Sequence, residues 1–444
     1  MRLSLKSRPR DVPSSVGIVH LGIGAFHRAH QAVYTEDAGD GWGICGITQR
    51  SATVAERLAP QDGLYSVLER GPGPASARVI GAVREVLTGE ATAERITDPA
   101  VKVVSLTVTE KGYRHDPATG RLRGDDPEIS LDLAGRPPRT VIGRLVRGLA
   151  GREAPVTVLC CDNLTANGET VRALVEEYCE RGGIRLPCEV SFPSTMVDRI
   201  TPATTREDLD EAERLLGVRD EAVVVTEPFS QWVIEDVFPA GRPAWDSAGA
   251  ILTGDVAPYE KMKLRLLNGS HSMLAYLGSG FEYVSEAIDV LGDPIRHFMD
   301  EDASPTLDVP PGFDLAAYKS SLLERFANPA LRHRVAQIAM DGSQKLPQRL
   351  LGVVRDRLAA GAEPRWAALA VAAWMRHVQT ARVLDDPMAD LLRTAVAGVD
   401  SAEKVVDALL SVTDIFGSDL RDSAVFRDLL VEQLARLSSG ARAY

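Results

Sequence analysis

The first part of the chain alternates short apolar runs with segments of helical periodicity. Near-continuous apolar runs separated by helical patterns are typical of parallel strands that are buried on both faces of a sheet. The pattern therefore predicts a doubly wound α/β domain. The runs predicted as strands are residues 17–21, 42–48, 101–108 and 156–161, with 190–192 and 222–226 as two further candidates.

From about residue 255 onward the periodicity is almost wholly helical. We therefore expect two domains, a doubly wound parallel sheet in residues 1–254 and a mostly α-helical domain in residues 255–444. The clearest helical runs are residues 315–326, 331–340, 346–360, 366–378 and 402–412.

One predicted helix of the second domain carries an unusual set of polar residues. Leu264, Leu267 and Leu274 recur at helical spacing, and Pro258 lies where a first turn would begin. A solvated helix face would not interleave large apolar side chains with polar ones, whereas the wall of a buried pocket would. The alternative is a core helix whose polar groups are satisfied and whose lysine reaches water.

Four polar side chains share one arc of this helix. At 3.6 residues per turn, Glu260, His271 and Asn268 lie about 60°, 80° and 140° from Lys263. A lysine in a buried wall loses hydration, so we expect the pKa of Lys263 to fall. A neutral lysine can then act as a general base.

A glycine loop follows the first predicted strand. Gly22-x-Gly24 is expected to open a helix, where a dinucleotide pyrophosphate meets backbone amides. His27 stands where the usual fingerprint has a third glycine, so a simple strand-to-helix turn is the alternative. The dinucleotide interpretation makes the first domain Rossmann-type. Its expected cofactor contacts are Gly22, Gly24, Ala25, Phe26 and Arg28, with His27 as a weaker candidate; His27 and His30 are otherwise helix-surface histidines.

The residues after the second predicted strand bear on the choice of cofactor. A carboxylate at this point would bind the ribose hydroxyls of NAD, but the strand ends Gln49-Arg50 without Asp or Glu nearby. Arg50 could pair with the 2′-phosphate of NADP, stack on adenine or lie in solvent. NAD and NADP therefore both stay open at this point.

Two further polar residues are predicted at strand ends, where ligands bind in open α/β sheets. Asn163 follows the run 156–161 and could donate its amide to a substrate oxygen, or cap the next helix. Asp198 follows another predicted strand. It could tune Lys263 electrostatically, or else form a surface pair with Arg199 or cap a helix.

Composition excludes several classes of protein. A net charge of −12 over 444 residues argues against nucleic acid or an anionic membrane as partner. The opening residues lack the apolar core of a signal peptide. Five cysteines without a Cys-x2-Cys spacing predict neither a disulfide framework nor a zinc site, and they fit a reducing cytoplasm.

Taken in order along the chain, several segments resemble the mannitol dehydrogenase family, the long-chain polyol dehydrogenases. They are residues 18–31, 105–113, 161–164, 196–200, 227–229, 231–236 and 340–345, together with the spacing Lys263-x4-Asn268-x2-His271. The resemblance implies a metal-independent oxidoreductase that uses NAD, with NADP kept open. It implies that Asn163 and Asn268 hold the reacting oxygen, and it supports Asp198 beside the base.

The proposed mechanism has Lys263 take the hydroxyl proton of a secondary alcohol as hydride leaves to the nicotinamide. In it, His271 positions a neighbouring hydroxyl and Glu260 relays the proton to solvent. The alternative of another class is a nucleotide-sensing protein without catalysis. The intact set of Lys263, Asn268, His271 and Asn163 argues against that alternative.

The substrate is expected to be a sugar acid or a polyol. Many mannitol enzymes of the resembling family have an arginine eight residues before the lysine that matches Lys345, where this chain has Gln337. The runs 337–351 and 270–278 look more like fructuronate reductases. Lys345 and Arg349 could bind a sugar-acid carboxylate, although Arg349 could also be a helix-surface charge. D-mannonate and D-fructuronate are favoured, mannitol and fructose are the alternative, and the family contains many monomers.

Overall fold

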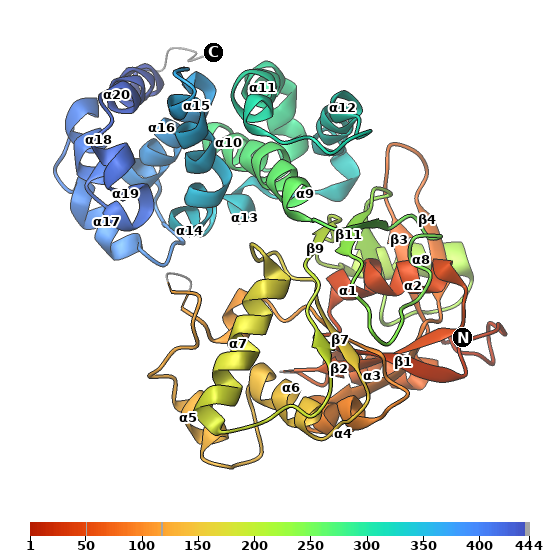
Figure 1. Ribbon diagram of the computed structural model, residues 1–444. Coiled ribbons are helices and arrows are strands. Elements are labelled where there is room, and N and C mark those ends of the chain that lie inside the picture. Colours follow the sequence, from red (N-terminus) through yellow and green to blue (C-terminus); the bar gives the residue numbers. More distant parts are fainter. Residues whose placement is uncertain (50, 117–118, 440–444) are drawn as a thin grey trace. The chain divides into compact units, whose positions relative to one another are not determined.

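The computed structural model describes residues 1–49, 51–116 and 119–439. The chain divides into two compact units, Met1–Ala257 and Pro258–Tyr444 (Figure 1). Arg50 lies outside the described residues, so its predicted cofactor contact stays a prediction.

The first unit is built on a six-stranded parallel sheet in the order β5-β2-β1-β6-β7-β8. The order reverses at β1, whose residue Leu21 is in register with Ile47 of β2 on one side and Leu106 of β6 on the other. This arrangement confirms the predicted doubly wound α/β class. The strands are β1 (Ser15–Leu21), β2 (Trp42–Thr48), β5 (Val83–Thr88), β6 (Val103–Leu106), β7 (Val156–Cys160) and β8 (Val190–Ser191).

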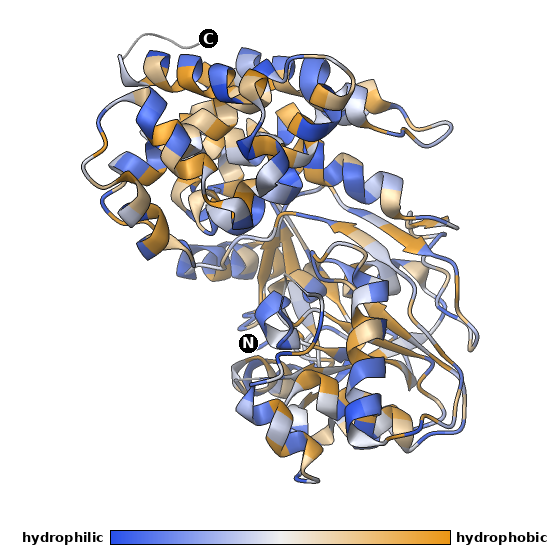
Figure 2. Ribbon diagram, turned by 60° about the vertical axis from the view of Figure 1, so that its left-hand side comes forward, coloured by the Kyte–Doolittle hydropathy of each residue, from blue (hydrophilic) through white to orange (hydrophobic). Residues whose placement is uncertain are grey.

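Helices cover both faces of this sheet because its strands are apolar on both sides. Val104 and Val158 point into a core with α4 (Thr92–Thr97), α6 (Val141–Ala150) and α7 (Asn167–Gly182). Ile18 and Leu159 point into the opposite core, with α1 (Ala25–Ala29), α2 (Gln31–Ala38) and the end of α3 (Thr53–Leu58). Figure 2 shows the apolar colours concentrated in the strands of this unit. Polar side chains that reach water are thereby left to the strand ends.

Two smaller sheets complete the first unit. One has the order β10-β3-β4 and the other β12-β11-β9. The candidate strand at residues 222–226 is confirmed as β10, but it pairs with β3 in a smaller sheet and not with the main parallel sheet. The remaining strands are β3 (Tyr65–Glu69), β4 (Ser76–Ile80), β9 (Thr195–Asp198), β10 (Val224–Thr226), β11 (Gln231–Glu235) and β12 (Ile251–Thr253).

A buried carboxylate holds the β10-β3-β4 sheet to its surroundings. Asp220, which is fully buried, accepts hydrogen bonds from the Ser66 amide and hydroxyl, each 2.6 Å long. It also accepts from Gln61 Nε2 at 2.8 Å and from the Ala222 amide at 2.7 Å. One side chain therefore satisfies four donors of three separate segments.

The second unit is helical throughout its described part. Its central helix, α16 (Arg365–Thr380), is apolar around most of its circumference and packs against α10 and α20. The others are α9 (Ala257–Met262), which begins in the first unit, α10 (Gly269–Leu277), α11 (Val284–His297), α12 (Leu315–Phe326), α13 (Val335–Ala339), α14 (Gly342–Leu346), α15 (Gly352–Ala359), α17 (Ala389–Val396), α18 (Ala402–Leu410), α19 (Thr413–Arg421) and α20 (Ala424–Ser438).

The helical runs predicted at 315–326, 366–378 and 402–412 correspond to α12, α16 and α18. The single helix predicted over residues 331–340 is wrong. Arg332 has a left-handed φ of 45°, and Arg334 forms a bridge with Tyr283, so α13 begins only at Val335. The run 346–360 is composite, with a π-helical turn η8 (Pro347–Leu351) before α15.

No helix in the described part of the chain is long and apolar enough to span a bilayer. All five cysteines are free thiols, and Cys45, Cys160 and Cys161 are buried.

We expect Asp220→Ala to lower the free energy of unfolding of the first unit by about 3 kcal/mol or more, because it leaves several buried donors without an acceptor. Urea unfolding followed by circular dichroism measures the change. The control is Asp210→Ala. The Asp210 side chain is 61% exposed in its ion pair with Arg219, so its loss should change the free energy by at most about 0.5 kcal/mol. Equal effects of the two substitutions would contradict the assignment.

Candidate active site

The glycine loop lies at the carboxyl end of β1, where the strand order reverses. Gly22 has a φ of +97°, and its amide donates to the Ile47 carbonyl at 2.9 Å. A Cβ at Gly22 would overlap the Thr107 carbonyl oxygen after β6. At Gly24, which precedes α1, a Cβ would meet only the Gly22 oxygen, at 3.7 Å. The loop is thus tightly packed at Gly22 and open at Gly24, which fits close approach of a pyrophosphate to the backbone.

His27 fills the space that a third glycine leaves in the usual fingerprint. Its ring stacks on that of His20 with a centroid distance of 3.4 Å and an interplanar angle of 16°. Both rings are buried between α1 and β1. The surface alternatives for His27 and His30 are therefore wrong, because both side chains are buried. That His27 lies near the phosphates stays a prediction.

The stacked pair is part of a buried polar network under the loop. His20 Nδ1 lies 2.8 Å from Ser105 Oγ, and its Nε2 lies 2.8 Å from Thr107 Oγ1. Thr107 donates to the Gly22 carbonyl at 2.9 Å, which fixes that carbonyl from below. Burial lowers the pKa of His20 to about 3 and that of His27 well below its usual range, so both rings are neutral.

Arg28 does not take the predicted role. Its guanidinium is buried, donates to the Ala222 carbonyl at 2.5 Å and lies over the Tyr65 ring. The expectation that Arg28 supplies charge to a phosphate is corrected to a structural role, since it holds α1 to the β10-β3-β4 sheet. Phe26, partly buried, stacks on His30 with a centroid distance of 5.1 Å, and Ala25 begins α1.

The end of β7 carries a polar pair. Asp162 accepts hydrogen bonds from the Val108 amide at 2.9 Å and the Tyr113 hydroxyl at 2.7 Å, and burial raises its pKa. This carboxylate links the ends of β6 and β7, and no motif had singled it out. Asn163 follows it in a bend and is exposed. The cap of α7 is Ala166, so the capping alternative for Asn163 is wrong.

Asp198 lies within a strand rather than after one. It is the last residue of β9, is 4% exposed, and is in register with Gln231 of β11. The alternative of a surface pair with Arg199 is wrong, because Arg199 is also buried. Its guanidinium pairs with Glu69 at 2.7 Å and donates to the Glu227 carbonyl.

In the second unit, the predicted helix around Lys263 contains a π-helical turn. This turn, η4 (Lys263–Asn268), separates α9 from α10 and corrects the expectation of a regular helix. A π turn bonds residue i to i+5 and has more residues per turn, so the angles calculated for Asn268 and His271 do not apply. Single π turns inside α-helices are frequently found at functional sites.

The η4 turn buries Lys263, which is 8% exposed, and leaves Asn268 partly exposed. On another side of the turn, Arg265 binds Asp356 of α15 at 2.6 Å and the Thr306 carbonyl at 3.2 Å. These contacts anchor the turn to its own unit. Glu260, in α9, is partly buried.

His271 lies one helical turn further along, in α10, and is 7% exposed. Its ring contacts Phe326 at a centroid distance of 4.7 Å and the His333 ring at 5.2 Å. Burial lowers the pKa of His271 well below its usual range, and nearby His333, Arg325, Arg349 and Lys263 lower it further. Its Nε2 is buried without a hydrogen-bond partner among the described residues.

Lys345 and Arg349 belong to a group of basic residues around His271 that we call the cationic group. Its other members are Lys263, Arg325 and His333. Lys345, in α14, donates from Nζ to the Met340 carbonyl at 2.5 Å and to the Ile338 carbonyl at 3.2 Å. Burial, followed by the Arg349 charge, lowers its pKa to about 8. Arg349, in η8, donates to Ser272 Oγ at 3.3 Å, and burial lowers its pKa to about 10. The surface alternative for Arg349 is therefore wrong.

The structure differs from the predicted substrate residues at three positions. The Gln337 side chain is exposed on α13, and the structure does not bring it into the cationic group. Arg325 and His333 were missed, because α12 and the segment after η7 (Pro329–Leu331) reach His271 only through the fold. Within the described residues no group of three or more His, Cys, Asp or Glu is placed to hold a metal ion.

Comparison with known proteins covers almost the whole chain. The family description "Mannitol dehydrogenase Rossmann domain" matches residues 16–247, and "Mannitol dehydrogenase C-terminal domain" matches residues 255–438. The chain is 46% identical to the uncharacterized oxidoreductase YeiQ of Escherichia coli strain K12, over 92% of this chain and 89% of that protein.

Two similar proteins have informative names. The D-mannonate oxidoreductase of Escherichia coli strain K12 is 43% identical, over 92% of this chain and 90% of that protein. A solved structure of Pseudomonas fluorescens mannitol 2-dehydrogenase, a ternary complex with NAD and D-mannitol, is 35% identical with a TM-score of 0.85. It covers 99% of this chain and 97% of its own.

We expect Gly22→Ala to lower the free energy of unfolding by about 2 kcal/mol, because it adds strain at a positive φ to an overlap with Thr107. Gly24→Ala is the matched control, since its φ of −86° suits alanine and its Cβ has room. Urea unfolding of both variants measures the difference. Indistinguishable variants would contradict the assigned loop geometry.

Proposed function

This chain belongs to the mannitol dehydrogenase family, and we propose on that basis that it is an NAD-dependent oxidoreductase of a sugar acid, with D-mannonate and D-fructuronate as its substrate pair. The single observation that carries the substrate assignment is the cationic group of the second unit. A neutral polyol would leave Lys345 and Arg349 with neutral partners only, whereas a carboxylate would neutralise one of these two charges.

The two cations that we assign to the carboxylate are available for it. Lys345 donates to backbone carbonyls and Arg349 to a serine hydroxyl, and neither forms an ion pair with a carboxylate in the described part of the chain. Both are partly buried, so an ionic contact there is less screened than one in water. The guanidinium of Arg349 can bind both carboxylate oxygens.

We assign the dinucleotide to the glycine loop at the carboxyl end of β1. The assignment is supported by the similar mannitol 2-dehydrogenase, which was solved as a complex with NAD. Gly22 and Gly24 would hold the pyrophosphate through the backbone, next to Ala25 and Phe26. When bound, the nicotinamide supplies the hydride acceptor for alcohol oxidation and the donor for ketone reduction.

Residues of the chain transfer the hydroxyl proton of the substrate and bind its reacting oxygen. We assign Lys263 as the base that takes the hydroxyl proton during oxidation and returns it during reduction. Asn268 and Asn163 donate amide hydrogens to the reacting oxygen, whose negative charge grows in the transition state. Glu260, close in sequence to Lys263, relays the proton to solvent, and Asp198 supplies a negative charge that tunes the base.

His271 is assigned to position the substrate rather than to exchange protons. Its lowered pKa keeps the ring neutral, and its buried Nε2 can bond a hydroxyl next to the reacting carbon. The second candidate function is mannitol 2-dehydrogenase. It is favoured by the likeness to the enzyme solved with D-mannitol over nearly the whole chain.

The two functions are separated by a substrate panel. Purified protein is offered fructuronate, tagaturonate and fructose, first with NADH and then with NADPH, and nicotinamide oxidation is followed by absorbance. Selective turnover of fructuronate supports the proposal. Selective turnover of fructose would overturn it in favour of the mannitol enzyme.

We expect Lys263→Ala to lower turnover by roughly 10²- to 10⁴-fold, because the proton acceptor is lost. Nicotinamide binding, followed by fluorescence, should stay within about twofold of wild type, since an alanine here leaves the glycine loop unchanged. Lys261→Ala is the control from the neighbouring turn, where Lys261 faces Asp308 and Asp356. Near-normal turnover of Lys263→Ala would refute the base assignment.

We expect the kcat/KM for fructuronate to fall, relative to that for fructose, as the pH rises through about 8. Lys345 carries its charge below this pH and loses it above, so the carboxylate contact weakens while a neutral ketose is unaffected. Lys345→Arg should shift the fall to higher pH, because a guanidinium stays charged. A ratio that is independent of pH in the wild-type enzyme would contradict the contact.

A further inference from the structure

A cavity of about 640 Å³ lies in the first unit beside the ends of two strands of the main sheet. Gln49 follows β2, and Val108 follows β6; both line it. Thr140 and Arg144, at the beginning of α6, line it as well. The cavity therefore lies at the carboxyl edge of the sheet, where dinucleotides bind in doubly wound folds.

Arg144 is held at the ends of β2 and β5. Its Nη1 donates to Gln49 Oε1 at 3.1 Å, and its Nε donates to the Pro138 carbonyl at 3.2 Å. Gly89 follows β5, and a Cβ there would overlap the Arg144 guanidinium. A glycine thus leaves the space that the guanidinium occupies, and Gln49 fixes its direction.

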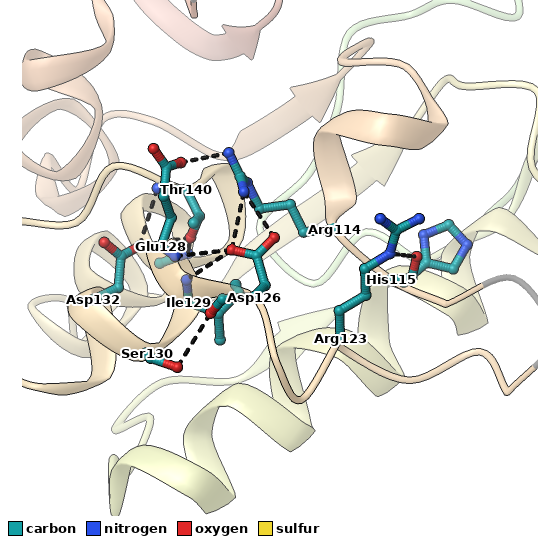
Figure 3. Close-up of polar contacts among 10 residues, drawn as sticks. Arg114, His115, Arg123, Asp126, Glu128, Ile129, Ser130, Asp132 and Thr140 are labelled. Carbon is teal, nitrogen blue, oxygen red and sulfur yellow. Dashed lines mark hydrogen bonds and ion pairs between the residues drawn. The ribbon is translucent and has the colours of Figure 1, made fainter.

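Two arginines that line this cavity, Arg114 and Arg144, differ in their hydrogen-bond and ion-pair partners. Figure 3 shows Arg114 bound to Asp126, at 2.8 Å, and to Glu128. Arg144, by contrast, forms no ion pair with a carboxylate in the described ranges, since its contacts are an amide oxygen and a backbone carbonyl. Three carboxylates attract Arg144 without forming an ion pair with it: Asp132 most strongly, then Glu90 and Glu128, which both line the cavity.

We propose that Arg144 binds the 2′-phosphate of NADP(H), so that the enzyme accepts the phosphorylated cofactor as well as NAD(H). In doubly wound folds the adenosine ribose lies at the end of the second strand, where a carboxylate selects NAD and an arginine accommodates the 2′-phosphate. This chain has Gln49 there, and its amide oxygen accepts a hydrogen bond from the Arg144 guanidinium. Arg50, the candidate that follows Gln49 in the sequence, lies outside the described residues, so the assignment is made for Arg144 alone. The inference rests on the proposed function only in taking the ligand to be a nicotinamide dinucleotide.

The test is calorimetric binding of adenosine 2′,5′-bisphosphate and of ADP, which share the adenosine and differ in where the second phosphate is attached. We expect Arg144→Gln to weaken adenosine 2′,5′-bisphosphate about tenfold or more and to leave ADP within about threefold. Arg147→Gln, an exposed position of the same helix, is the matched control and should change neither. Circular dichroism checks that each variant is folded.

A second variant tests the position of the Arg144 guanidinium without removing its positive charge. Gly89→Ala keeps Arg144 but should displace its guanidinium, so it should weaken the bisphosphate selectively as well. Equal losses of both nucleotides, or no loss, in Arg144→Gln would overturn the proposal. Tight binding of ADP with turnover of NADH alone would then leave the proposed function standing. A selective loss of the bisphosphate in a protein that turns over no sugar would support Arg144 and refute the proposed function instead.

Discussion

A sheet that is buried on both faces can place its polar chemistry only at the ends of its strands, and this constraint organises the first unit. Ile18 and Val104 face opposite cores, so no polar side chain in the middle of the sheet could reach water. Gly22, Gln49 and Asp162 follow β1, β2 and β7 at the same edge. The glycine loop, the Arg144 cavity and the Asp162 network are consequences of one packing arrangement.

The second unit meets a different constraint, since it holds several basic side chains close together around His271. Two of these cations have neutral partners: backbone carbonyls bind Lys345, and Ser272 binds Arg349. The His271 ring, among these charges, stays unprotonated. Such a group favours an anion over any neutral ligand of the same shape, because each cation has already lost part of its hydration.

The sequence was sufficient for features that depend on local pattern. The run 42–48 coincides with β2 and 315–326 with α12, because continuous apolar strands and regular amphipathic helices have clear periodicity. Prediction from the sequence failed where contacts between distant segments determine the structure. The local sequence of β10 does not distinguish it from a strand of the main sheet, although β10 pairs with β3. The half-buried strands β4 and β5 were not predicted, because they lack a continuous apolar run. The sequence predicted Arg28 as a phosphate ligand, whereas in the structure its guanidinium donates to the Ala222 carbonyl.

The stacked rings of His20 and His27 limit how this loop can evolve. In the common fingerprint a glycine lets helix and strand approach closely, whereas here two imidazoles fill that gap at a centroid distance of 3.4 Å. Replacing either ring alone by a small residue would leave a void beside the other ring. The route from this loop to the three-glycine form therefore passes through a less stable intermediate, and we expect the two positions to vary together among descendants of a common ancestor.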